Sequence, residues 1–194
     1  MELFHQIKFL LRITRTHDIV RRYFVVNGFD GALTMMGLII GFQISGLNDL
    51  TIIINACLGA AIALGMSGVS SAYISEAAER KRALGKLEDA MVTDLQDSAH
   101  GEAMRWVPLL IAIVNGLAPL TISLLILTPL WLANVGFSLP LSPLSSAISM
   151  AFILIFLLGV FLGRIAEISW LRSGIQTLLI ASATVFLIYL FTGG

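Results

Sequence analysis

The chain has 194 residues, of which 57% are hydrophobic and 12% are charged, with twelve acidic and twelve basic residues. A soluble domain has roughly twice that share of charged residues, so the composition excludes an ordinary soluble protein. The balanced charge argues against a nucleic-acid partner, and the single cysteine, Cys57, excludes an intrachain disulfide.

Long apolar stretches alternate with short charged segments along the whole chain. A membrane-spanning helix needs about 20 mostly apolar residues. Five stretches meet this requirement: 23–47, 51–78, 106–132, 144–164 and 171–191. We therefore expect an all-α polytopic membrane protein with five transmembrane helices in a lipid bilayer.

The basic residues predict the orientation of these helices. Five Lys or Arg residues lie in 8–22, five in 80–105 and two in 164–172, and the connecting segments between these groups hold none. Because cytoplasmic loops accumulate Lys and Arg, we expect the N-terminus in the cytoplasm and the C-terminus on the opposite side. The cell membrane is the expected location.

Residues 1–22 precede the first span and combine apolar and basic side chains. The apolar residues recur at helical spacing, and basic residues flank them: Leu3, Ile7, Leu10, Leu11, Lys8, Arg12 and Arg15. This pattern predicts an amphipathic helix on the membrane surface. The first two transmembrane helices are then expected within 23–78.

The segment 79–105 is expected to be an acidic cytoplasmic helical segment that continues the second span, and 106–194 to hold transmembrane helices three to five. Seven of the twelve acidic residues lie within 75–104. Glu88 and Glu102 fall within or beside a helical apolar stripe, which makes them candidate ligands for a cation. The alternative is that these acids form a solvated charged surface.

Asp30 stands about seven residues inside the first span, roughly 10 Å along a helix. A carboxylate inside a membrane is costly without a partner and is a functional hypothesis by default. The alternative is a local ion pair with Arg21 or Arg22.

Two further acids, Glu76 and Glu79, are three residues apart near the predicted cytoplasmic end of the second span. Carboxylates suit hard or borderline cations, and the thioether of Met66 would add preference for a softer transition metal. The alternative for Met66 is simple packing. In the third span, Pro119 frees the backbone around Asn115, which is tolerated in a membrane where it lines a cavity.

Catalytic motifs are absent from the sequence. There is no nucleophile elbow, zinc-protease helix or phosphate-binding loop, so we expect neither an enzyme nor a prosthetic group.

Three segments resemble the vacuolar iron transporter family. Residues 27–34 (NGFDGALT) resemble its Asn-Asp-Gly-x-x-Thr region, residues 73–80 (YISEAAER) are similar to its Tyr-Leu-Ser-Glu-x-x-Glu ending, and 163–174 look like its closing hairpin. Where that family has a Met and an acidic residue four apart, this chain has Gly68 and Ala72.

The resemblance implies a five-span homodimer that exports Fe(II), and often Mn(II), from the cytoplasm in exchange for protons. Asp30 would be the intramembrane carboxylate for the metal or the proton, with Glu76 and Glu79 as capture ligands. We therefore expect a divalent transition-metal exporter that works as an antiporter. The alternative is a non-transporting membrane protein whose cytoplasmic helices sense metal or dock a partner.

Overall fold

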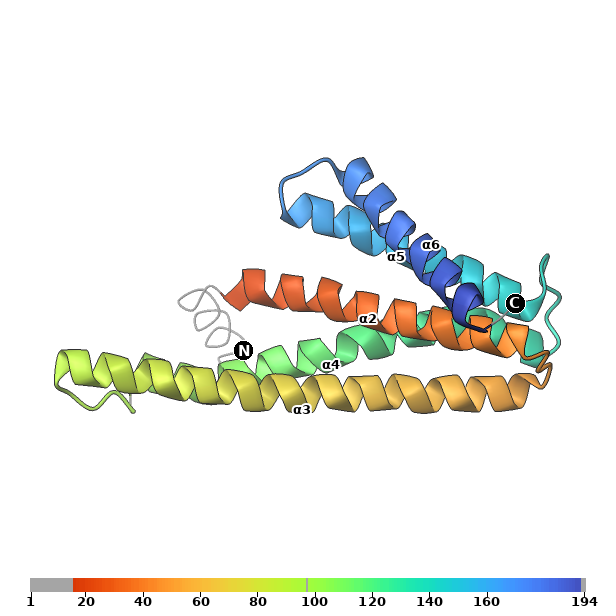
Figure 1. Ribbon diagram of the computed structural model, residues 1–194. Helices are drawn as coiled ribbons and strands as arrows, with labels where there is room; N and C mark the ends of the chain where they lie inside the picture. The colour runs from red at the N-terminus through yellow and green to blue at the C-terminus, as the bar shows by residue number, and fades with distance from the viewer. Residues whose placement is uncertain (1–15, 97, 193–194) are drawn as a thin grey trace.

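A computed structural model describes residues 16–96 and 98–192, and this part of the chain contains helices and no strands. The helices are α2 (Thr16–Ile44), α3 (Leu50–Met91), α4 (Ala99–Asn134), α5 (Pro143–Ile165) and α6 (Trp170–Thr192) (Figure 1). Each contains a segment long and apolar enough to cross a membrane. The expected all-α class with five membrane-spanning helices is confirmed, and the chain is an integral membrane protein.

The start of the chain differs from the expected boundary at residue 22. Residues 1–15 lie outside the described part of the chain, so the amphipathic helix stays a prediction there. Residues 16–22 are the first turns of α2, which continues without a break into the first span.

The longest helix, α3, has 42 residues and is about 63 Å long. Since the hydrocarbon core of a bilayer is about 30 Å thick, about half of α3 lies outside it. The end of α3 and the start of α4 form a hairpin that extends beyond the other helices (Figure 1). We call this end of the bundle the hairpin end.

Backbone and side-chain bonds close the turn of this hairpin. Val92 takes the left-handed conformation, with φ of 51°, and its N–H bonds to the carbonyl of Glu88. The Glu88 carboxylate accepts the N–H of Leu95 at 3.0 Å. The segment predicted as 79–105 is thus built from the last turns of α3, a short connection and the first turns of α4.

The apolar core fills the half of the bundle away from the hairpin end. Its largest buried side chains come from α2, α3, α4 and α5: Met35, Met36, Ile39, Ile40, Ile53, Ile126, Leu127, Leu130 and Ile155. Toward the hairpin end, a second and smaller apolar cluster of Val107 and Ile111 with Val20 and Tyr23 lies beside buried polar side chains of α3 and α4. The candidate site lies among these buried polar side chains.

The last two helices form a second hairpin that packs mainly on itself and on α2. Small residues bring α5 and α6 together: a Cβ at Gly163 would lie 2.9 Å from the Cβ of Ser173. Close approach through small residues is typical of helices in membranes. The two helices diverge from α2 toward the hairpin end, and α6 crosses α2 near the opposite end (Figure 1).

Candidate functional site

Five polar side chains from three helices meet in the hairpin-end half of the bundle. We call them the polar cluster: Tyr23 and Asn27 of α2, Glu76 and Arg80 of α3, and Asn115 of α4. Glu76 is only 8% exposed and Asn115 only 6%. Buried polar groups are expensive unless they are paired, so the arrangement of this cluster constrains how the three helices pack.

Glu76 has two partners. The Tyr23 hydroxyl donates to Glu76 Oε1 at 3.3 Å, and Arg80 Nε lies 3.6 Å from Glu76 Oε2. Arg80 Nε is itself buried and donates no hydrogen bond to any described residue. The carboxylate is therefore compensated by one partly buried cation on its own helix and tied to α2 by a phenol.

The two asparagines connect all three helices. Asn27 Nδ2 donates to the carbonyl of Tyr23 at 2.8 Å and also to Oδ1 of Asn115. Asn115 Nδ2 donates to the carbonyl of Gly68 at 2.8 Å. The amide of Asn115 thus joins α2 on one side and α3 on the other.

Glycines allow the backbones to come this close. A Cβ at Gly68 would lie 2.9 Å from the carbonyl oxygen of Asn115, and a Cβ at Gly31 would lie 2.6 Å from that of Pro119. Because Pro119 has no N–H, the Asn115 carbonyl also lacks its helical donor. The segment around Asn115 and Pro119 is tightly packed against α2 and α3 at these positions. That it lines a cavity stays a prediction.

Asp30 lies apart from the polar cluster. Tyr23, Asp30 and Gly37 are seven residues apart and so lie on one side of α2. At one end of this row Tyr23 bonds to α3, and at the other a Cβ at Gly37 would lie 3.7 Å from Ile188 of α6. Between these two contacts the side chain of Asp30 is exposed.

The described residues offer Asp30 no hydrogen bond or ion pair. Arg21 and Arg22, the local partners considered from the sequence, are exposed two turns away and do not pair with it. Asp30 is therefore a carboxylate inside a membrane span, and the described residues leave it accessible on this side of α2.

The other predicted ligands are dispersed. Glu76 turns into the bundle, whereas Glu79 is exposed, and the Glu88 carboxylate is used to close the hairpin turn. Glu102 is exposed, and Met66 is 61% exposed. Among the described residues no three His, Cys, Asp or Glu side chains are placed to share a metal ion. The predicted ligand set is not assembled within one protomer.

Sequence reasoning missed Tyr23, Asn27 and Arg80 as members of the polar cluster. A signal was available for Asn27, because an amide inside an apolar span needs a hydrogen-bond partner. Tyr23 and Glu76 are 53 residues apart. No local pattern in the sequence links two residues at that separation.

The fold and this cluster define a polytopic helical membrane protein with a polar site between its first three spans. The chain is 30% identical over 173 residues to the uncharacterized protein MJ0645 of Methanocaldococcus jannaschii, across 87% of this chain and 86% of that protein. It belongs to the same family as this archaeal protein. No protein-family model and no solved structure matches the chain.

Proposed function

We propose that the protein exports a divalent transition-metal ion, Fe(II) or Mn(II), from the cytoplasm in exchange for protons. The observation that carries the proposal is Asp30, an exposed carboxylate inside a membrane span with no partner among the described residues. An intramembrane carboxylate facing lipid is costly, so this side of α2 has to meet water, a cation or another protein surface.

A second copy of the chain is the partner that best completes the site. In a two-fold symmetric dimer the same surface meets itself, so two Asp30 side chains would face each other across the axis. Two carboxylates supply the charge and the oxygen donors that a hard or borderline divalent cation prefers. The ion would then cross the membrane between protomers rather than through one of them.

The charge distribution supports entry of the ion at the hairpin end. This end carries the basic residues that mark the cytoplasmic side. It also carries exposed carboxylates, including Glu79 and Glu102, which would raise the local cation concentration. Tyr23 and Asp30 lie on one side of α2 about 10 Å apart. Glu76, which bonds to Tyr23, is therefore about two helical turns from Asp30 toward the hairpin end.

Proton exchange follows from the chemistry of a single carboxylate. A bound cation favours the ionised form of Asp30, and a proton removes the charge that holds the cation. A proton taken up as the metal leaves would prevent its return and couple the two fluxes.

The proposed preference for Mn(II) or Fe(II) depends on oxygen atoms as the ligands that the protein offers. The family that the chain resembles has a Met at the position of Gly68 and an acidic residue at the position of Ala72. In this chain α4 packs against Gly68, and Ala72 is buried. Met66 is exposed and could offer its thioether only on the outer surface of α3. Carboxylates without a thioether suit Mn(II) and Fe(II) better than softer metals.

The test is transport by the purified protein in liposomes that contain a metal-sensitive dye, with Mn(II), Fe(II), Zn(II) and Ca(II) compared. We expect Asp30→Asn to abolish Mn(II) flux, because it removes the charge without changing the shape. Asp89→Asn, which removes an exposed carboxylate from the extended hairpin, is the matched control and should keep most of the flux. Flux that survives Asp30→Asn would refute the role of Asp30.

A second function is favoured by the length of α3. Its continuation beyond the membrane with exposed acids would also suit a non-transporting protein that senses metal or docks a partner through the hairpin. Metal binding that depends on Glu79 and Glu102, with no flux of any of the four ions, would favour this function over export.

A further inference from the structure

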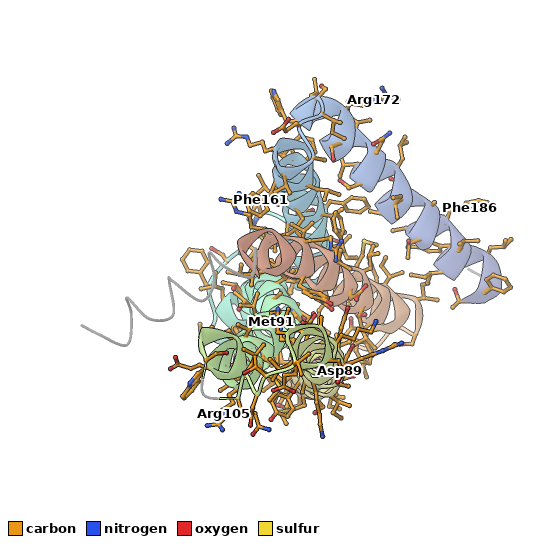
Figure 2. All side chains as sticks on the ribbon, turned by 90° about the vertical axis from the view of Figure 1, so that its left-hand side faces the viewer. Asp89, Met91, Arg105, Phe161, Arg172 and Phe186 are labelled. Carbon is orange, nitrogen blue, oxygen red and sulfur yellow. The ribbon has the colours of Figure 1, made fainter. Side chains whose placement is uncertain are left out.

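A groove runs along the outside of the bundle on the side of α2 that faces α5. Its volume is about 220 Å³, and six apolar side chains line it: Phe24 of α2, Ile122 of α4, and Leu154, Leu157, Leu158 and Phe161 of α5. Leu157 is 52% exposed and Phe161 is 40% exposed, so the groove is open along α5. In Figure 2, Phe161 lies on the side of α5 away from α6.

The groove is a gap between helices at membrane depth. All six lining residues belong to segments apolar enough to cross the bilayer. Gly28 identifies the side of α2 that faces the groove, because a Cβ there would lie 3.2 Å from Leu158 and 3.4 Å from Ile122. The material that surrounds such a groove in a membrane is the acyl chain of a lipid.

Two arginines continue the walls of this groove toward the hairpin end. Arg21 precedes Phe24 by three residues on α2, and Arg164 follows Phe161 by three residues in the last turn of α5. Residues three apart lie on one side of a helix, so each arginine lies about one turn beyond the groove on its lining side. α2 begins at the hairpin end and α5 finishes there, which puts both arginines at the same mouth (Figure 1).

Neither guanidinium has an acidic partner in the part of the chain that the structure describes, and both side chains are exposed. Guanidinium groups bind phosphate oxygens through paired, charge-assisted hydrogen bonds. Basic positions between helix ends at the membrane surface are a known way to hold anionic headgroups.

We infer that this groove is a binding site for one anionic membrane phospholipid, with an acyl chain against the six apolar side chains and the phosphate between Arg21 and Arg164. A zwitterionic lipid would fill the groove equally well but gains less from the arginines, because its own ammonium group compensates the phosphate. The bound lipid would tie α5 to α2 where the two helices diverge. This inference is independent of the proposed transport.

Native mass spectrometry of the purified protein in detergent tests the site. The probes are dioleoyl phosphatidylglycerol and dioleoyl phosphatidylcholine, titrated separately. Each arginine is expected to strengthen binding of the anionic lipid about fivefold, so the wild-type chain should prefer it about twentyfold or more. Arg21→Gln combined with Arg164→Gln should reduce this preference to near unity. Arg172→Gln is the matched control and should keep this preference, because Arg172 lies near the start of α6 (Figure 2), which begins at the same end as α5 finishes (Figure 1).

A second variant tests the groove rather than the charges. Leu157→Trp enlarges a half-exposed side chain at the rim and should weaken both lipids about tenfold without unfolding the protein, which a thermal melt checks. Equal lipid preference in the wild-type chain and the double arginine variant would overturn the inference. So would unchanged binding in Leu157→Trp, or competition by millimolar inorganic phosphate, which would indicate a site for free anions.

Discussion

Glu76 shows how one buried side chain can tie two helices of a membrane bundle together. Its carboxylate is held by the hydroxyl of Tyr23 and by Arg80, and Glu76 is buried whereas both partners are partly exposed. Under the proposed transport, a cation that reached Glu76 would have to compete with Arg80 for the same oxygen atoms. Arg80 would then limit how tightly Glu76 holds the metal.

Removing Arg80 should destabilise the fold. Arg80→Gln leaves a buried carboxylate without its charge partner, and we expect the free energy of unfolding to fall by about 3 kcal/mol. Unfolding in mixed micelles of increasing dodecyl sulfate measures this change. Arg82→Gln, an exposed neighbour, should change it by less than about 0.5 kcal/mol.

The double variant Glu76→Gln with Arg80→Gln separates charge from packing. Because it removes both charges together, it should recover most of the stability lost in Arg80→Gln. If the double variant is as unstable as Arg80→Gln, the ion pair is not what stabilises this part of the bundle.

At the scale of the helices, close contact between α3 and α4 fixes which residues can act as ligands. Gly68 lies against the Asn115 carbonyl and accepts the Asn115 amide through its own carbonyl. No side chain fits there, so a thioether or carboxylate at this position would have to push α4 away. The close packing of α3 and α4 therefore also explains why residue 68 offers no side chain as a ligand.

Gly68→Ala should therefore be costly. The added Cβ would lie 2.9 Å from a backbone oxygen that cannot move without its helix, and we expect a loss of about 1–3 kcal/mol in unfolding free energy. The control is Gly59→Ala on the same helix, where nothing lies within 4 Å and alanine should be neutral or slightly stabilising. Equal effects of the two substitutions on the dodecyl sulfate midpoint would show that α3 and α4 are not in this contact.

The helices themselves could be predicted from the sequence because hydropathy and length alone identify a membrane span. All five were predicted. α3 continues beyond the membrane span to Met91, and the apolar side chain of Leu84 is still buried in this extension. The direction of each polar side chain could not be predicted. Glu76 and Glu79 are three residues apart, yet one is buried and the other exposed, because α4 and, beside it, Tyr23 of α2 cover only one side of α3.

At the scale of the whole molecule, residues 16–96 and 98–192 of one protomer leave the side chain of Asp30 uncovered. α5 covers the side of α2 opposite Asp30, α3 contacts the Asp30 side at Tyr23, and α6 contacts it at Gly37. A bilayer solvates an ionised carboxylate poorly, so in lipid the Asp30 side of the described bundle needs a further covering surface. A homodimer formed through this side of α2 would cover the carboxylate and create a polar route along the symmetry axis.

A cysteine beside Asp30 tests that arrangement in native membranes. Val26 is 50% exposed and lies one turn from Asp30 on the same side of α2, so Val26→Cys in two facing copies should form an intermolecular disulfide under mild oxidation. Native Cys57 is fully buried and should not interfere. Ile153→Cys on α5 is 55% exposed but belongs to the helix that packs on the other side of α2, and it should stay monomeric on a non-reducing gel. Efficient crosslinking of Ile153→Cys with none of Val26→Cys would place the dimer contact on α5. Asp30 would then face lipid or water without a partner subunit, and a shared route for the ion between two protomers would be ruled out.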